Sequence, residues 1–446
     1  MQSELSFSTR DEFSRKPIAE KLINLLESDI DLSPIVINGD WGTGKTEFCL
    51  KTIQEMKGSN EKLKCVYIDA FNADSSDEPI LTLIAAIVSL FPDKEDKKSI
   101  INKAIPVIKY ASKVLLNAST TLILKENAEK LGEDLSEALK DQTATAIDAT
   151  IDNLLDTHEK STENISALRS ILESLSFDSP VIVFIDELDR CRPNYALKMI
   201  ESIKHIFNIK NVKFVLVTNV NQLSSSINKL YGESINANRY MDKFIGFKID
   251  LPDYSIQRGL SKDYNSTSYF RFLIREKKEL SVFLNEGYFE FAAYLIEINN
   301  LSLRDVEKFV KYLLVYQLVN DQAINDRSNY LISLCYIIGI FIYSVDSVAK
   351  EKFLNKSYSC EDLIEFFSID KNSDKSDSGY SGYYAIERIV INFLKEAEDY
   401  DEYKKANSEL ITKLEKLWEY AGNNSLRLNR NFGEYTTNAI YRLMLI

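Results

Sequence analysis

The sequence is poor in the residues that interrupt helices. It has 14 glycines and 8 prolines among 446 residues. Together they make up about 5% of the chain, where average proteins have about 12%. This scarcity excludes collagen-like and glycine-rich chains and argues against an all-β fold with many tight turns. We therefore expect a mostly helical protein.

Histidine and cysteine are also scarce. The two histidines, His158 and His205, lie far apart in the sequence, which argues against a His-rich metal site and against a Ser–His–Asp triad. The cysteines are odd in number, widely spaced and form no CxxC pair, a pattern typical of reduced, mostly buried thiols in a cytoplasmic protein. They are Cys49, Cys65, Cys191, Cys335 and Cys360.

Basic residues are fewer than acidic ones. The chain has 54 basic and 67 acidic side chains, and its formal net charge is −13. Such a surface repels a phosphate backbone overall. Net charge therefore gives no support to nucleic-acid binding, although a local basic groove stays open as an alternative. Hydrophobic residues make up 45% of the chain, which is enough for a real core. At roughly 100–200 residues per domain, the length predicts two or three domains.

Long apolar runs are almost absent. The first residues are charged and contain no apolar core, so we expect no signal peptide. Pro79–Pro92 has 14 uncharged residues, too few to span a bilayer. Ser328–Val345 has 18, at the lower limit for a span, and it contains several polar side chains. We interpret it as a buried helix and expect no membrane span, with a span as the alternative.

Short apolar runs alternate with helical patterns in two parts of the chain. Strands are predicted at Ile35–Ile37, Leu63–Ile68, Val181–Ile185, Lys213–Val217 and Phe247–Leu251. Helical spacing follows or precedes them at Phe13–Leu26, Thr46–Met56 and Lys198–Phe207. This alternation predicts an α/β core with a parallel sheet.

The remaining segments have helical patterns only. We expect residues 1–79 and 178–255 to form the two parts of the α/β core, residues 80–177 a helical insertion, and residues 256–446 a C-terminal helical domain. The insertion helices are predicted at 80–90, 100–116, 128–154 and 166–175. Those of the C-terminal region are predicted at 267–275, 287–298, 303–318, 330–345, 385–397 and 409–420.

The sharpest local signal is GDWGTGKT at Gly39–Thr46, which fits GxxxxGK[ST] and which we call the phosphate loop. Its glycines allow a tight turn in which backbone N–H groups converge on phosphate oxygens, and the following helix points its positive end at the same anion. A Gly-rich turn with an incidental lysine is the alternative. The predicted nucleotide-binding residues are Gly39, Asp40, Trp41, Gly42, Thr43, Gly44, Lys45, Thr46 and Glu47.

A second site must supply the carboxylates of a nucleotide-hydrolysing centre. The buried strand at Val181–Ile185 is followed directly by Asp186 and Glu187. We predict that Thr46 and Asp186 hold Mg²⁺ and that Glu187 polarises the attacking water. Asn219, after the next strand, could orient water or sense the γ-phosphate. A solvated acidic turn and a plain turn residue are the respective alternatives.

Several segments together resemble the KAP family of P-loop NTPases. They include DEFSRKPIAEKLINLL at Asp11–Leu26, the phosphate loop with its tryptophan, Asp69–Asn72, FIDELDRCRP at Phe184–Pro193, Arg239–Phe244 and Leu303–Asp305. The resemblance implies an ATP-binding core of the additional-strand class, related to AAA+ and STAND proteins. In that class the strand that carries the metal ligand lies one strand away from the phosphate-loop strand. Bacterial members are similar to proteins implicated in phage exclusion, so the resemblance implies antiviral defence as the setting.

The resemblance also draws attention to two departures and three arginines. Phe71 stands where members usually have tryptophan, and Glu187 where they often have aspartate; neither argues against hydrolysis. The resemblance implies that Arg239, or Arg190, could reach the γ-phosphate of a neighbouring subunit, and that Arg304 could report nucleotide state to the C-terminal helices. Pairing of Arg190 with nearby acids, or simple solvation of any of the three, is the alternative.

These observations predict an Mg²⁺-dependent ATPase that acts as a conformational switch, with homo-oligomers as expected assemblies. One alternative is a weakly hydrolysing scaffold that serves a partner effector protein. Another is an ATPase stimulated by nucleic acid, for which Leu426–Asn431 with Tyr435 and Tyr441 could supply contacts.

Overall fold

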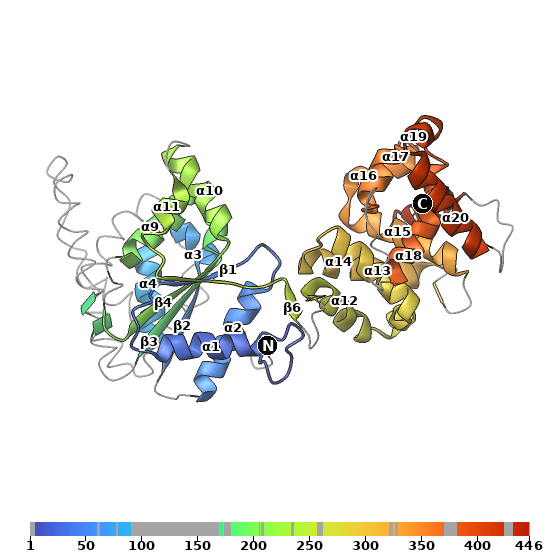
Figure 1. The fold of residues 1–446 in the computed structure, drawn as a ribbon. Coiled ribbons are helices and arrows are strands. Elements are labelled where there is room, and N and C mark those ends of the chain that lie inside the picture. Colours follow the sequence, from blue (N-terminus) through green and yellow to red (C-terminus); the bar gives the residue numbers. More distant parts are fainter. Residues whose placement is uncertain are drawn as a thin grey trace. The chain divides into compact units, whose positions relative to one another are not determined.

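The chain forms two compact units in the computed structural model (Figure 1). They are Met1–Pro252 and Asp253–Ile446, here called the first and the second unit. The predicted insertion helices at 100–116 and 128–154, and most of the one at 166–175, lie outside the described residues. The structure describes residues 5–59, 63–76, 79–90, 169–170, 172–173, 180–204, 206, 209–232, 236–256, 262–320, 324–325, 329–369, 381–422 and 431–445.

A five-stranded parallel sheet forms the centre of the first unit, and all five predicted strands belong to it. The strands are β1 (Ile35–Asn38), β2 (Lys64–Asp69), β3 (Val181–Asp186), β4 (Val212–Thr218) and β5 (Phe247–Asp250). They lie in the order β2-β3-β4-β1-β5, and each neighbouring pair is parallel (Figure 1). Because β4 separates β1 from β3, the expected additional-strand arrangement is confirmed.

Helices cover both faces of this sheet. On one face lie α1 (Lys16–Glu27) and α2 (Lys45–Ser59), close to their predicted positions. The helices of the other face are α4 (Pro79–Val88), α9 (Pro193–Lys204), α10 (Val220–Tyr231) and α11 (Ala237–Met241). The sequence predicted α4 and α9 but not α10 and α11. Short turns follow two strands: α3 (Ala70–Ala73) and η2 (Asp74–Ser76) after β2, and η3 (Leu188–Arg190) after β3.

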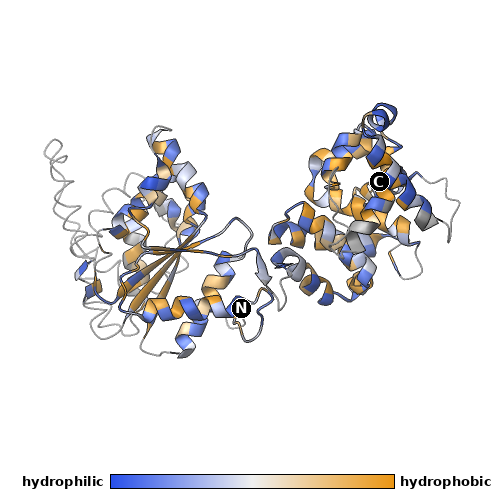
Figure 2. Cartoon of the chain, viewed as in Figure 1, coloured by the Kyte–Doolittle hydropathy of each residue, from blue (hydrophilic) through white to orange (hydrophobic). Residues whose placement is uncertain are grey.

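Every residue of β3 is buried, and its side chains alternate between the two hydrophobic layers. Val181, Val183 and Ile185 pack with α4, α9 and α10, whereas Ile182 and Phe184 pack with α1 and α2. A strand covered on both faces has to be a continuous apolar run. Figure 2 shows the sheet coloured mostly as hydrophobic, with hydrophilic residues on the outer sides of the helices.

The second unit begins with a hairpin that the sequence analysis did not foresee. The expectation of helical patterns only at residues 256–446 is wrong here, because β7 (Lys262–Tyr264) pairs antiparallel with β6 (Tyr254–Ile256). The rings of Tyr254 and Tyr264 are 6.4 Å apart, and Lys262 Nζ lies 4.4 Å from the centre of the Tyr254 ring. Such cross-strand contacts stabilise a short pair.

Helices make up the rest of the described second unit, and all six predicted ones are present. The additional ones are α16, α17, α19, α21 and the 3-10 helix η4. The bounds are α12 (Asn265–Arg275), η4 (Lys278–Leu284), α13 (Glu286–Ile298), α14 (Leu303–Val319), α15 (Tyr330–Val345), α16 (Ser347–Asn355), α17 (Cys360–Phe366), α18 (Ser381–Leu394), α19 (Tyr400–Ala406), α20 (Ser408–Gly422) and α21 (Phe432–Leu443).

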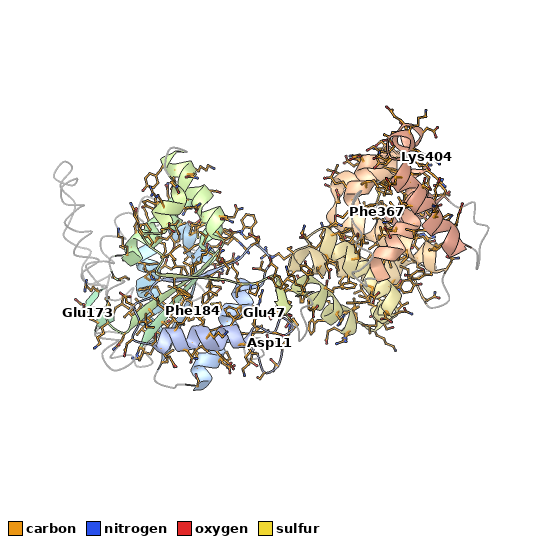
Figure 3. All side chains as sticks on the ribbon, viewed as in Figure 1. Asp11, Glu47, Glu173, Phe184, Phe367 and Lys404 are labelled. Atoms are coloured by element: carbon orange, nitrogen blue, oxygen red, sulfur yellow. The ribbon has the colours of Figure 1, made fainter. Side chains whose placement is uncertain are left out.

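The apolar helix α15 is the core of this unit, as predicted. Most of its side chains are buried, and it packs closely along α21. A Cβ at Gly339 would collide with the backbone of Thr436 on α21, so glycine permits the close approach of the two helices. Among the described residues, no helix is long and apolar enough to cross a bilayer. Figure 3 labels one buried aromatic of each unit, Phe184 and Phe367.

Candidate functional site

The parallel register brings four strand ends to one edge of the sheet. Asp69 at the end of β2 is level with Asp186 at the end of β3, and Asn38 at the end of β1 is level with Thr218 at the end of β4. The residues that follow these strands are therefore neighbours in space, although they are far apart in the sequence. This carboxyl edge is where parallel α/β sheets bind ligands.

The phosphate loop makes a tight turn between β1 and α2. Gly42 and Gly44 have φ of 78° and 79°, a left-handed conformation that glycine adopts without strain. Thr43 closes the turn, because its N–H and its hydroxyl both donate to the carbonyl of Asp40, at 3.3 and 2.9 Å. A Cβ at Gly39 would lie 2.8 Å from Thr43 Oγ1. The loop is therefore compact, and the first N–H groups of α2 follow it directly. A compact loop at the N-terminus of a helix is the arrangement that binds phosphate.

Lys45, the first residue of α2, folds back over the loop. Its Nζ donates to the carbonyls of Gly39 and Asp40, at 2.7 and 3.0 Å. Burial lowers the pKa of Lys45, and the charge of Asp189 is the largest influence that opposes this shift. The loop thus holds an amine whose positive charge is supported by neighbouring carboxylates, where an anion would be drawn.

Asp186 is the most enclosed carboxylate of the site, with 1% of its surface exposed. Tyr67 Oη donates to its Oδ2 at 3.0 Å, and the backbone N–H of Glu187 donates to its Oδ1 at 2.7 Å. Burial raises the pKa of Asp186, whereas the hydrogen bonds from Thr46, Glu187 and Tyr67 lower it. Thr46 Oγ1 also lies 3.5 Å from Glu187 Oε1. Thr46 and Asp186 together offer a hydroxyl and a carboxylate, which are donors that fit Mg²⁺.

Glu187 has a left-handed backbone, with φ of 63°, at the turn between β3 and η3. Its Oε2 lies 2.5 Å from Arg190 Nε. Burial raises the pKa of Glu187, the charge of Arg190 lowers it, and Asp186 raises it. Arg190 therefore pairs with a neighbouring acid, one of the two interpretations that the sequence left open.

Asn219 lies at the tip of β4, between the loop strand and the metal strand. Its Oδ1 caps α10 by accepting from the N–H groups of Asn221 and Gln222, and its Nδ2 donates to Asp40 Oδ1 at 3.0 Å. The side chain is therefore fixed at both ends and directed at the phosphate loop. Asn38 accepts a 2.9 Å bond from Val220 N and so joins β1 to the same turn.

Two predicted residues of the first unit, Glu47 and Arg239, are not brought to this group of side chains. Glu47, labelled in Figure 3, forms ion pairs on the flank of α2 with Lys51 at 2.7 Å and Arg10 at 3.6 Å. Arg239 is an exposed residue of α11. Arg304 is an exposed residue of α14 in the second unit. Their roles stay predictions. Residues 426–430 lie outside the described part of the chain.

Three further residues support the site and were not predicted. Tyr67 contacts Asp186, and Asp189 accepts from Trp41 and Thr218. Arg15, which is 2% exposed, donates from Nη1 to the carbonyl of Thr43 at 2.7 Å. Asp189 stands in the segment that carries the family resemblance, so its position was a signal. Arg15 stands in another of those segments, Asp11–Leu26. No local pattern marks Tyr67, since its partner comes from a distant segment.

Comparison with known proteins agrees with this geometry. The model of the KAP family P-loop domain matches residues 15–320, more than half of the chain. No curated protein sequence matches significantly. Two solved structures are similar: the Aeropyrum pernix ORC2 protein in ADPNP-ADP complexes and a DNA replication initiation factor. The former has 13% identity and a TM-score of 0.37 over 97% of this chain and 95% of that one. The latter has 12% identity and a TM-score of 0.29 over 92% and 95%. Such low scores add nothing to the family match.

Proposed function

Because the chain belongs to the KAP family of P-loop NTPases, we propose that it binds and hydrolyses ATP with Mg²⁺ and uses the reaction as a conformational switch. One observation carries the proposal: the phosphate loop and the carboxylates after β3 meet at one edge of the sheet. Thr46 Oγ1 lies 3.5 Å from Glu187 Oε1, although the two residues are far apart in the sequence. Fold similarity alone would not place these groups together.

The residues divide the work of phosphoryl transfer between them. The N–H groups of the loop and of the first turn of α2 receive phosphate oxygens, and Lys45 exchanges its carbonyl partners for them. Thr46 and Asp186 would hold Mg²⁺, which when bound neutralises charge on the phosphates. Glu187 would accept a hydrogen bond from the attacking water, and its raised pKa supports this role because it makes the carboxylate a stronger base. Asn219 steadies the loop through Asp40.

The test is Mg²⁺-dependent ATP turnover by the full chain and by Lys45→Ala and Glu187→Gln. We expect turnover to fall about 100-fold or more in each variant, because phosphate charge or water orientation is lost. The matched controls are Lys57→Ala and Glu20→Gln, exposed residues of α2 and α1, which should keep parental turnover. Turnover that survives both site changes would refute the proposal.

A scaffold that hydrolyses weakly is the second candidate, and the pairing of Glu187 with Arg190 favours it. In that pair, the guanidinium competes with water for the carboxylate. A partner effector protein, or a neighbouring copy in a homo-oligomer, would then have to draw Arg190 away. Tight ATP binding with no turnover, even after assembly, would support this candidate over the first.

The setting that we propose is antiviral defence, which the family resemblance alone supports, in the cytoplasm, which the pattern of cysteines in the sequence supports. A phage-plating assay with cells that express the chain tests it, and Lys45→Ala should abolish any protection. Equal plating on cells with and without the chain would count against this setting and leave the biochemical proposal intact.

A further inference from the structure

Asp189 is a buried carboxylate to which the proposed reaction gives no role. It lies in η3, which follows the predicted metal ligand Asp186 and the water-orienting Glu187 in the sequence. It is 9% exposed. Its Oδ2 accepts a hydrogen bond of 2.5 Å from Trp41 Nε1. Its Oδ1 accepts one of 3.0 Å from Thr218 Oγ1. The carboxylate therefore joins the phosphate loop to the last residue of β4.

A parallel contact holds the preceding loop residue. Asn219 Nδ2 donates to Asp40 Oδ1 at 3.0 Å. Consecutive loop residues, Asp40 and Trp41, are thus tied to the consecutive residues Asn219 and Thr218, the latter through Asp189. Because β4 lies between β1 and β3, these ties fix the first half of the loop relative to the strand that carries Asp186.

The indole of Trp41 lies at the surface of the site and is hydrogen-bonded to Asp189. Its side chain is 48% exposed, so burial alone gives it little orientation. A hydrogen bond from a neutral donor to an ionised carboxylate is stronger than one between neutral groups, and more so where water is excluded. The same carboxylate is the nearby charge that most opposes the lowering of the Lys45 pKa by burial.

We propose that Asp189 is a positioning residue for nucleotide binding, holding the phosphate loop in its phosphate-receiving shape through the indole of Trp41 and the hydroxyl of Thr218. A loop that is already ordered loses less conformational freedom when it binds a ligand, so its affinity is higher. The claim about affinity rests on the proposed function. The bond between Asp189 and Trp41 does not.

The experiment uses the full chain with Trp418→Phe, which leaves Trp41 as its only tryptophan because the chain has two. Two properties are measured: acrylamide quenching of Trp41 emission, and affinity for ADP that carries a fluorescent N-methylanthraniloyl group. Asp189→Asn and Thr218→Val test the contact. Thr52→Val is the matched control, because Thr52 is as buried as Thr218 but donates to the carbonyl of Phe48.

In Asp189→Asn we expect stronger quenching of Trp41 and roughly tenfold weaker nucleotide binding, the equivalent of one charge-assisted hydrogen bond. Thr218→Val should change both properties in the same direction and by less, and Thr52→Val should change neither. In chains with Trp41→Phe, adding Asp189→Asn should cause a smaller loss of affinity than it does when Trp41 is present, because the bond between the two side chains is already absent.

Unchanged quenching of Trp41 in Asp189→Asn would overturn the inference, whether or not the affinity for the nucleotide changes. So would additive losses in the Trp41→Phe series. A parent protein that fails to bind the nucleotide would refute the proposed function and, with it, the claim about affinity, while the quenching measurement would still decide the contact. A circular-dichroism melt of each variant checks that it is folded. If Asp189→Asn does not fold, the quenching and the affinity measured in Thr218→Val still test the contact.

Discussion

Asp186 shows how a buried carboxylate can be satisfied by hydrogen-bond donors from several elements. Burial alone raises its pKa, and three hydrogen-bond donors oppose that shift. One donor is Tyr67, whose hydroxyl reaches across from β2. The sequence placed Asp186 correctly, because a buried strand has to deliver its last residue to the edge of the sheet. It could not place Tyr67, because that contact depends on the register between β2 and β3.

The cysteine side chains allow a prediction at the same scale. All five are free and buried. Burial raises the pKa of Cys65 and of Cys360 to about 12 and raises that of the other three as well. The thiolate is the reactive form, and at pH 8 a thiol with such a pKa is ionised in only about one molecule in ten thousand.

We therefore expect negligible reaction of the native protein with Ellman's reagent at pH 8 over several minutes. All five thiols should react after unfolding in guanidinium chloride. Since the folded pKa values lie above the unfolded ones, the thiols also make the folded state less stable as pH rises above about 9. Rapid labelling of even one thiol in the native protein would contradict this prediction.

Among the elements, α15 depends most on one small residue. Alanine at Gly339 would gain about 1 kcal/mol in helix propensity. It would also force α21 away, because the new Cβ would meet the Thr436 carbonyl and lie 2.9 Å from the Cβ of Ala439. Overpacking of this kind costs about 1–3 kcal/mol, and backbone cannot rotate aside as a side chain can.

We expect Gly339→Ala to lower the free energy of unfolding of the second unit by up to about 2 kcal/mol net. Urea unfolding followed by Trp418 emission measures it, since Trp418 packs on Phe432 at the start of α21, with ring centres 5.7 Å apart. Gly58→Ala in α2, where nothing lies within 4 Å of the new Cβ, is the control and should leave this transition unchanged. If Gly339→Ala stabilises the second unit, the close packing of α15 against α21 does not require glycine at this position.

The elements differ in how much the sequence revealed. β3 and α15 are continuous apolar runs, so burial on every side determines them and their positions were predicted well. The helix α10 has few buried apolar side chains, chiefly Leu223 and Ile227, and its start is fixed by the Asn219 cap. The β6–β7 hairpin depends on contacts between residues on its two strands. The small number of buried apolar side chains in α10 and the dependence of the hairpin on pairwise contacts explain why these two elements escaped prediction.

For the molecule as a whole, Arg15 is the residue that connects the phosphate loop to the end of the first unit. Its Nη1 donates to the Thr43 carbonyl at 2.7 Å and its Nη2 to the Pro252 carbonyl at 3.2 Å. Pro252 is the last residue of that unit. One guanidinium therefore links a residue of the phosphate loop to the point where the chain leaves for the second unit.

Arg15→Ala should lower the free energy of unfolding of the first unit by about 3 kcal/mol, because two charge-assisted hydrogen bonds to carbonyls are lost in a buried place. Trp41 emission during urea unfolding of the Trp418→Phe protein measures it. Lys16→Ala is the control: Lys16 is partly exposed and pairs with Glu55 at 3.3 Å, a contact worth at most about 1 kcal/mol. Equal stability of the two variants would contradict the proposed importance of Arg15.

The order of the strands has a consequence for the long segment between the two halves of the first unit. β2 and β3 are adjacent and parallel, and α4 lies between them in the sequence. A strand, a helix and a neighbouring parallel strand already complete one crossover. The connection that follows α4 therefore does not alter the order of the strands. Its length before Leu172, which is fully buried in the same hydrophobic core as α4 and α9, can vary while the nucleotide-binding edge keeps its strand order.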